Sequence, residues 1–149
     1  MRPVPARGEA MTRTVADIMA TRLVTFSPDM NIHDAIRVLL DQRISGAPVV
    51  DANGVLVGVL SKKDGVKIAL SSQYHGDRGG AVREFMSAPV QTLDAELDLV
   101  RAAQHFLDSH FRRFPVLRGG ELVGQVSRYD VLKALSDVQR PDFAYRRAD

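Results

Sequence analysis

Apolar residues recur along the chain at two spacings, one typical of helices and the other of strands. From residue 32 to residue 40 they follow the i, i+3, i+4, i+7, i+8 pattern of an amphipathic helix. Two short apolar runs follow, at 47–51 and 55–60, and predict a pair of strands. Asn53-Gly54 lies between them and favours the positive φ angles of a tight hairpin turn. A closing helix is expected from about residue 61 to residue 70.

The same order of elements is written a second time, 67 positions further along the chain. Met19 recurs as Met86, and the helical stripe recurs between residues 99 and 107. A one-residue deletion at the second hairpin turn changes the spacing to 66, so that Ser61 recurs as Ser127. Turns tolerate such deletions, and the chain is therefore an internal repeat.

Each copy is a β-α-β-β-α unit of about 55 residues, which is too small to bury its own sheet and is expected to pack against the other copy. Before each amphipathic helix stand a Val-x-x-x-Met turn, a short extended segment at 23–26 or 90–93, and an N-cap, Asn31 or Asp98. The fold class is therefore α+β. The predicted boundaries are a flexible N-terminal tail 1–13, a first repeat 14–71, a linker loop 72–81, a second repeat 82–136 and a C-terminal tail 137–149.

Composition excludes several classes of protein. Apolar residues make up 45% of the 149 positions and charged residues 26%, as in an ordinary globular protein. No run of about 18 apolar residues occurs, which excludes a membrane span. Cysteine is absent and the first ten residues have no signal-peptide core, so the cytoplasm is the expected compartment. The net charge is +2 with the basic residues dispersed, which argues against nucleic acid as a partner.

Neither a catalytic site nor a metal site is predicted. Neither copy holds a base beside a nucleophile, apart from one recurring serine and aspartate. The chain is therefore expected not to be an enzyme and to require no cofactor. The histidines, which show no metal-binding spacing, are His33, His75, His105 and His110.

The junction between the hairpin and the closing helix spells Gly-x-x-Ser-x-x-Asp in both copies, with Ser61 and Asp64 in the first and Ser127 and Asp130 in the second. One interpretation is a capping box, which satisfies helix amides and needs no ligand. The other is a nucleotide site, because a helix N-terminus attracts phosphate and a carboxylate accepts bonds from the paired hydroxyls of a ribose. The basic neighbours, which would either contact phosphate or form a solvated face, are Lys62, Lys63 and Arg128.

Together these features resemble a tandem of CBS domains, the repeat named after cystathionine β-synthase, in a stand-alone protein of bacterial type. The resemblance rests on the doubled Val-x-x-x-Met turn, the amphipathic helix and the Gly-x-x-Ser-x-x-Asp motif, and it covers about residues 14 to 136. It implies two repeats packed through their sheets around a pseudo-twofold axis into one CBS pair, or Bateman module. It also implies two clefts for AMP, ADP, ATP or related adenosyl ligands, in which the motif acid binds the ribose and the motif serine the phosphate or ribose.

The resemblance further implies which residues would line the clefts. The adenine would lie against the first strand and the loop entering the second, while Arg112 or Arg113 would reach the phosphate of a nucleotide held by Asp64. The first cleft is favoured because its small lining at 45–47 leaves room for a base, whereas Phe114 at the equivalent place would narrow the second cleft or belong to the core. The nucleotide-binding candidates are Thr25, Ser45, Gly46, Ala47, Ser61, Lys62, Lys63, Asp64, Thr92, Arg112, Arg113, Phe114, Ser127, Arg128 and Asp130.

Three functions are compatible with these features. The favoured one is a regulatory sensor that binds an adenine nucleotide, forms a homodimer and presents its bound state to an unidentified partner protein. The alternative is a ligand-free dimeric interaction scaffold, in which both motifs are only helix caps. Nucleic-acid binding, the third, would require a contiguous basic face and binding that weakens steeply with salt.

Overall fold

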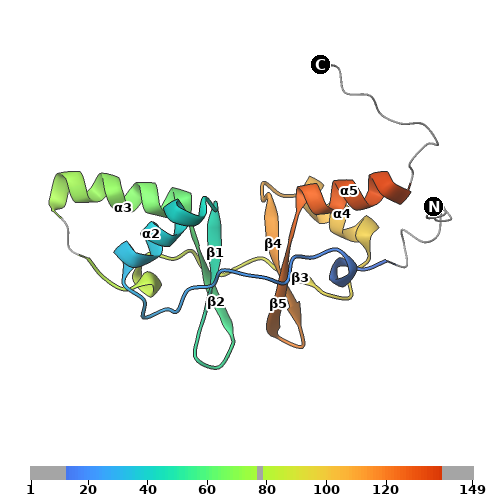
Figure 1. Ribbon diagram of the computed structural model, residues 1–149, viewed down its shortest axis with the longest axis horizontal. Helices are drawn as coiled ribbons and strands as arrows, with labels where there is room; N and C mark the ends of the chain where they lie inside the picture. Colours follow the sequence, from blue (N-terminus) through green and yellow to red (C-terminus); the bar gives the residue numbers. More distant parts are fainter. Residues whose placement is uncertain (1–12, 77–78, 139–149) are drawn as a thin grey trace, which may run out of the picture.

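The computed structural model describes residues 13–76 and 79–138 (Figure 1). The tails predicted at 1–13 and 137–149 therefore lie outside the described residues, except for Arg13 and the last two residues of the final helix. The first repeat forms η1 (Val15–Asp17), α2 (Ile32–Gln42), β1 (Gly46–Val50), β2 (Leu56–Ser61) and α3 (Lys62–His75). The second forms η2 (Val82–Glu84), β3 (Leu93–Asp94), α4 (Leu99–Leu107), β4 (Arg113–Arg118), β5 (Glu121–Ser127) and α5 (Arg128–Val138).

Each half of the molecule places its helices on one side of a small sheet, and the α+β class is confirmed. The strands β1 and β2 pair antiparallel, as do β4 and β5, and the two hairpins face one another at the centre of the molecule (Figure 1). The extended segments predicted at 23–26 and 90–93 are shorter than expected. One is a single parallel bridge from Phe26 to Val49, and the other is the two-residue strand β3.

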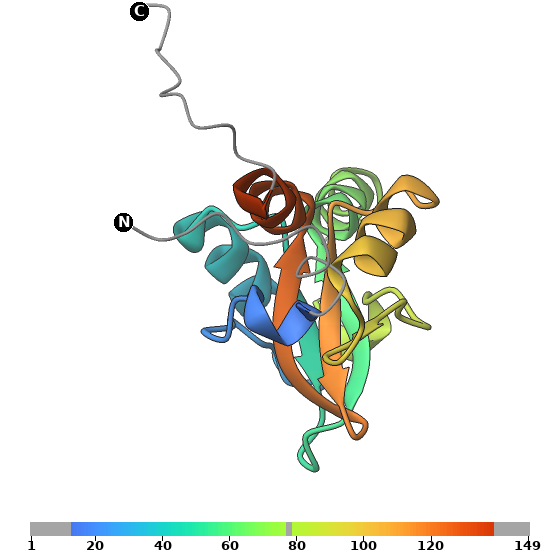
Figure 2. The ribbon, with the colours of Figure 1, turned by 90° about the vertical axis from the view of Figure 1, so that its right-hand side faces the viewer.

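The two repeats exchange their opening turns. Val15 of η1 is fully buried in the core of the second half, and its amide donates to the carbonyl of Leu97 at 2.8 Å. In the same way, Val82 of η2 is buried in the core of the first half and donates to the carbonyl of Met30 at 2.8 Å. Figures 1 and 2 show η1, in blue, beside the orange strands of the second half. Each structural half therefore contains one piece of the other sequence repeat.

Helix ends follow the predicted capping residues, with one extension. The side chain of Asn31 accepts from the amide of His33 and that of Asp98 from the amide of Arg101, both at 2.8 Å. The helix α3 continues through His75, so it takes in the first part of the predicted linker loop 72–81. Residues 72–75 include no proline or glycine and are therefore compatible with a helix. The helix ends at Gly76, where φ is +77°.

The first hairpin turn differs from the predicted Asn-Gly type. Gly54 has a φ of +81°, but Asn53 does not have a positive φ. The carboxylate of Asp51 instead accepts from the amides of Asn53 and Val55, both at 2.9 Å. This local bonding satisfies the turn and removes the need for two positive φ angles.

Among residues 13–76 and 79–138, no helix combines the length and apolarity needed to cross a membrane. The same residues contain no group of three or more acidic or histidine side chains arranged to hold a metal ion.

Candidate functional site

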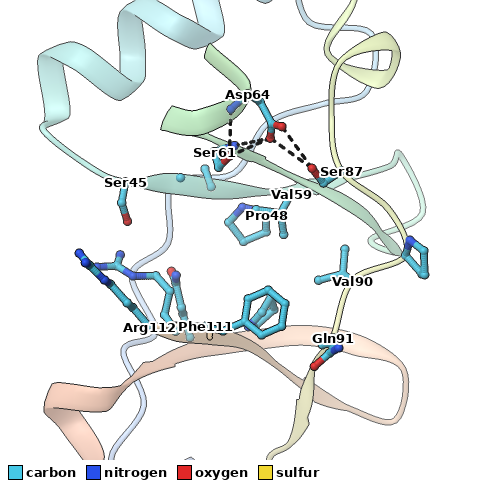
Figure 3. A pocket seen from close by; sticks show the side chains of 16 residues that line it. Ser45, Pro48, Val59, Ser61, Asp64, Ser87, Val90, Gln91, Phe111 and Arg112 are labelled. Atoms are coloured by element: carbon cyan, nitrogen blue, oxygen red, sulfur yellow. Dashed lines mark hydrogen bonds between the residues drawn. The ribbon is translucent and has the colours of Figure 1, made fainter. Parts of the chain in front are cut away.

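A cleft of about 300 Å³ lies between the two halves, with walls from both repeats (Figure 3). Most of its wall is apolar, and one carboxylate and two guanidinium groups are its charged members. The first half supplies Ser45, Gly46, Ala47, Pro48, Val59, Ser61 and Asp64. The segment after η2 and the second half supply Ser87, Pro89, Val90, Gln91, Phe111, Arg112, Arg113, Pro115 and Gln125.

In the described part of the chain, Asp64 is the only buried residue that is charged or polar. Its exposed fraction is 7%. Its Oδ2 accepts from both the amide and the hydroxyl of Ser61 at 2.9 Å, while its own amide donates to the Ser61 hydroxyl at 3.1 Å. This reciprocal pair is a capping box, and the capping interpretation of the motif is confirmed. The same carboxylate also forms part of the cleft wall, so the two interpretations do not exclude each other.

A third donor approaches Asp64 from the other repeat. The hydroxyl of Ser87 is 3.2 Å from Oδ1 and 3.4 Å from Oδ2. An ionised carboxylate has about four acceptor positions. Ser61 supplies both donors to Oδ2, whereas the Ser87 hydroxyl is the donor nearest to Oδ1, so Oδ1 is the oxygen that a ligand hydroxyl would reach.

The start of α3 offers fewer free amides than a helix N-terminus alone would suggest. The amide of Lys62 donates to the carbonyl of Ser45 at 2.8 Å, and that of Asp64 is bonded to Ser61. An anion in the cleft would therefore depend on side-chain cations more than on backbone amides. A phosphate bound at the helix start stays a prediction, with fewer amides to support it than the sequence suggests.

Those cations stand on the opposite wall. Arg112 and Arg113 are exposed and enter the cleft from the start of β4, and Figure 3 shows Arg112 beside Ser45 and across the open space from Asp64. Lys62, Lys63 and Arg128 are also exposed but lie outside the cleft wall.

The family model for the CBS domain matches residues 15–70 and 82–137. The chain belongs to the CBS domain family. The CBS domain-containing protein YhcV of Bacillus subtilis is 32% identical over 119 residues, which cover 79% of this chain and 82% of YhcV. The crystal structure of CBSX2, a protein of Arabidopsis thaliana, in complex with AMP matches with a TM-score of 0.73 and 31% identity over 85% of this chain and 98% of that one. The CBS domain pair of protein MJ0100, in complex with 5-methylthioadenosine and S-adenosyl-L-methionine, shares the fold at 22% identity and a TM-score of 0.68, over 84% and 97% of the two chains.

The second motif of this CBS pair also caps its helix, but its aspartate lies outside the cleft that holds Asp64. The amide of Ser127 donates to Oδ2 of Asp130 at 2.9 Å, and the amide of Asp130 donates to the Ser127 hydroxyl at 3.1 Å. Asp130 lines a separate depression of about 230 Å³, together with Arg13 and Lys133 among others. The structure therefore does not bring Asp130 to the cleft that holds Asp64.

Three other candidates lie away from the cleft. Thr25 lines a depression near the hairpin tips, and Thr92 is half-buried and outside the cleft wall. Phe114 is 2% exposed, and its ring centroid lies 4.8 Å from that of Phe106 in the core. Successive strand residues point to opposite faces, so Pro115 reaches the cleft where Phe114 does not. Phe114 therefore belongs to the core rather than to a ligand site.

Sequence reasoning missed the wall formed by 87–91 and by Phe111. The segment 87–91 reaches the cleft because η2 packs on the first half, and the amide and carbonyl of Ser87 bond to those of Val59. The exchange of turns decides this placement, and no spacing within one repeat reveals it. The residues that follow η2 form no motif that would mark them as part of a binding site.

Proposed function

We propose that this CBS pair is a regulatory module that binds an adenine nucleotide in the cleft between its halves. The observation that carries the proposal is the placement of one buried carboxylate, Asp64, and the guanidinium of Arg112 on facing walls of the same largely apolar cleft. A nucleoside phosphate has the complementary order of groups, with hydroxyls, a flat base and an anion.

The ribose is assigned to Asp64. Its Oδ1 atom, which is not used by the capping box, suits a sugar hydroxyl, and the capping box holds the carboxylate in one orientation. The hydroxyl of Ser61 already both donates to Asp64 and accepts from it, so we assign to Ser61 a supporting role and not a direct phosphate contact.

The base and the phosphate occupy the rest of the cleft. Ala47, Pro48, Val59 and Val90 give the apolar surface that a planar base requires, and the volume of about 300 Å³ is at the lower end of ordinary ligand sites. Arg112 and Arg113 would pair with the phosphate, for which a guanidinium is well shaped. We propose Lys62, Lys63 and Arg128 as a cationic surround without direct contact to the ligand.

The relatives support an adenosine-containing ligand and leave its class open. CBSX2 binds AMP in its crystal structure, and the MJ0100 domain pair binds 5-methylthioadenosine and S-adenosyl-L-methionine. Two guanidinium groups favour a phosphate over a sulfonium cation, because like charges in a common cleft repel. We therefore place AMP, ADP and ATP ahead of S-adenosylmethionine.

The module would act by binding and not by catalysis. A ligand shifts a protein only as far as it prefers one of two states, and an unidentified partner protein in the cytoplasm would read that shift. We propose a homodimer as the functional form, because apolar side chains are exposed along the helices. They include Leu40 at 67%, Val66 at 66%, Leu70 at 58%, Leu107 at 79% and Leu132 at 66%.

A ligand-free dimeric scaffold is the second candidate. One observation favours it: both aspartates are committed to capping boxes, and Asp130 has no place in the cleft. In that case the cleft would be a by-product of packing the two halves together.

Thermal unfolding with a ligand panel separates the two candidates. At about 100 times its dissociation constant a ligand adds roughly 2.7 kcal/mol, or about 5–10 °C of Tm for a chain of this size. AMP, ADP or ATP should give this shift, whereas S-adenosylmethionine should give a smaller one. If no adenosine ligand in the panel raises the Tm, the scaffold is the correct function.

A further inference from the structure

Ser87 distinguishes the two otherwise similar motifs of the CBS pair. Its hydroxyl faces both oxygens of Asp64, at 3.2 Å and 3.4 Å. The repeat offset that aligns Met86 with Met19 places Ala20 at the position of Ser87. By this correspondence the second motif, with its half-buried Asp130, has an alanine where the first motif has Ser87, and alanine has no hydroxyl to donate.

The backbone around the two positions is the same. Ser87 and Val59 exchange amide-to-carbonyl bonds at 2.9 and 3.0 Å, and Ala20 and Gln125 do so at the same two distances. The backbone at Ala20 therefore forms these two bonds although alanine has no hydroxyl. The Ser87 side chain is not needed to hold the turn.

The bond from Ser87 to Asp64 is a long one. Hydroxyl-to-carboxylate bonds usually measure about 2.5–2.7 Å, and both distances here are longer, at 3.2 Å and 3.4 Å. Ser87 is exposed on the cleft wall, and a rotation about χ1 removes its hydroxyl from Asp64 while the backbone bonds stay in place. The contact is thus suited to being replaced.

We propose that the Ser87 hydroxyl occupies the sugar-hydroxyl position on Asp64 in the empty cleft and competes with the ribose of an incoming nucleotide. This inference rests on the proposed function and assigns to Ser87 the setting of its affinity. The ribose hydroxyl takes the acceptor position on Oδ1, and the Ser87 side chain turns toward the solvent. The affinity of the cleft is then lower than Asp64 alone would give, so the module responds at a higher nucleotide concentration.

Replacing Ser87 by alanine removes the competitor and leaves the backbone unchanged. Since a single net hydrogen bond is worth about a fivefold change in an equilibrium constant, Ser87→Ala should bind AMP about fivefold more tightly than the native chain. The gain should vanish for 2′,3′-dideoxy-AMP, which has no ribose hydroxyl to offer. A change in general packing or stability would affect the two ligands alike.

Calorimetric titration of the full chain with AMP and with 2′,3′-dideoxy-AMP tests the inference. Ala20→Ser is the matched control, because it adds the same hydroxyl beside Asp130 and should leave AMP affinity unchanged. The role of Ser87 is overturned if Ser87→Ala binds AMP no more tightly than the native chain, or if the dideoxy ligand shows a gain of the same size. In either case, AMP binding by the native chain still upholds the proposed function. If neither the native chain nor Ser87→Ala binds AMP, the proposed function fails and the role of Ser87 fails with it.

Discussion

Met19 of the first repeat lies directly over Gly124 of the second. A methyl group added at Gly124 would be 2.4 Å from the sulfur of Met19 and 2.9 Å from the carbonyl oxygen of Ala20. Gly58 and Met86 form the equivalent contact in the other half. The glycine that opens each Gly-x-x-Ser-x-x-Asp motif therefore gives room to the opening turn of the other repeat, and does not serve a ligand.

Gly124→Ala should destabilise the protein because the Ala20 carbonyl cannot move as a flexible side chain can. We expect a loss of about 1–3 kcal/mol in the free energy of unfolding, the usual cost of overpacking. Urea denaturation measures it as a lower midpoint with an unchanged slope. A loss below about 0.5 kcal/mol, the ordinary range for surface changes, would show that the exchanged turn is loosely packed.

Gly65→Ala should have the opposite effect. Gly65 lies inside α3, and an added methyl group would have only Ile36 Cγ1 nearby, at 3.9 Å. Alanine in a helix interior is favoured over glycine by about 1 kcal/mol, so the urea midpoint should rise. Gly65 is outside the cleft wall, and AMP affinity should stay the same. A falling midpoint would mean that α3 needs this glycine for a reason that its surroundings do not show.

Arg112→Ala should weaken binding of AMP and leave binding of adenosine nearly unchanged, because only AMP carries the phosphate. Arg112 is exposed, so we expect a loss of a few-fold to about tenfold and not the full value of a buried pair. Titrations with the two ligands provide the comparison. Arg118→Ala is the control, since Arg118 is exposed at the far end of β4, the strand that Arg112 immediately precedes, and pairs with Glu96. Equal losses for both ligands would contradict a phosphate contact.

The homodimer is tested by the mass in solution at micromolar concentration. Light scattering should give twice the 16.4 kDa chain mass, and Leu132→Lys on α5 should lower it, because a charge would be placed in an apolar interface. Val55→Lys, at a site 48% exposed in the hairpin turn, is the matched control and should keep the native mass. A native chain of monomeric mass would rule out the dimer as the functional form.

The sequence predicted the fold more fully than the site. Doubled periodicity located both amphipathic helices and both hairpins, because those elements depend on contacts close in sequence. It also placed Asp64, Ser45 and Arg112 in one cleft, through the family resemblance. Ser87 and Phe111 were missed, and Phe114, for which both a cleft position and core packing were considered, lies in the core because strand alternation turns it inward. The first two outcomes depend on how one repeat crosses to the other, which the spacing within a repeat does not encode.

Calorimetric titration of AMP into the native chain and two variants tests the nucleotide site most directly. Asp64→Ala and Asp130→Ala each remove one capping carboxylate, at a comparable cost of about 1 kcal/mol in stability. We predict one AMP bound per native chain, with binding lost in Asp64→Ala and kept in Asp130→Ala. Equal AMP binding by both variants, or no heat from the native chain, would contradict a nucleotide site built on Asp64.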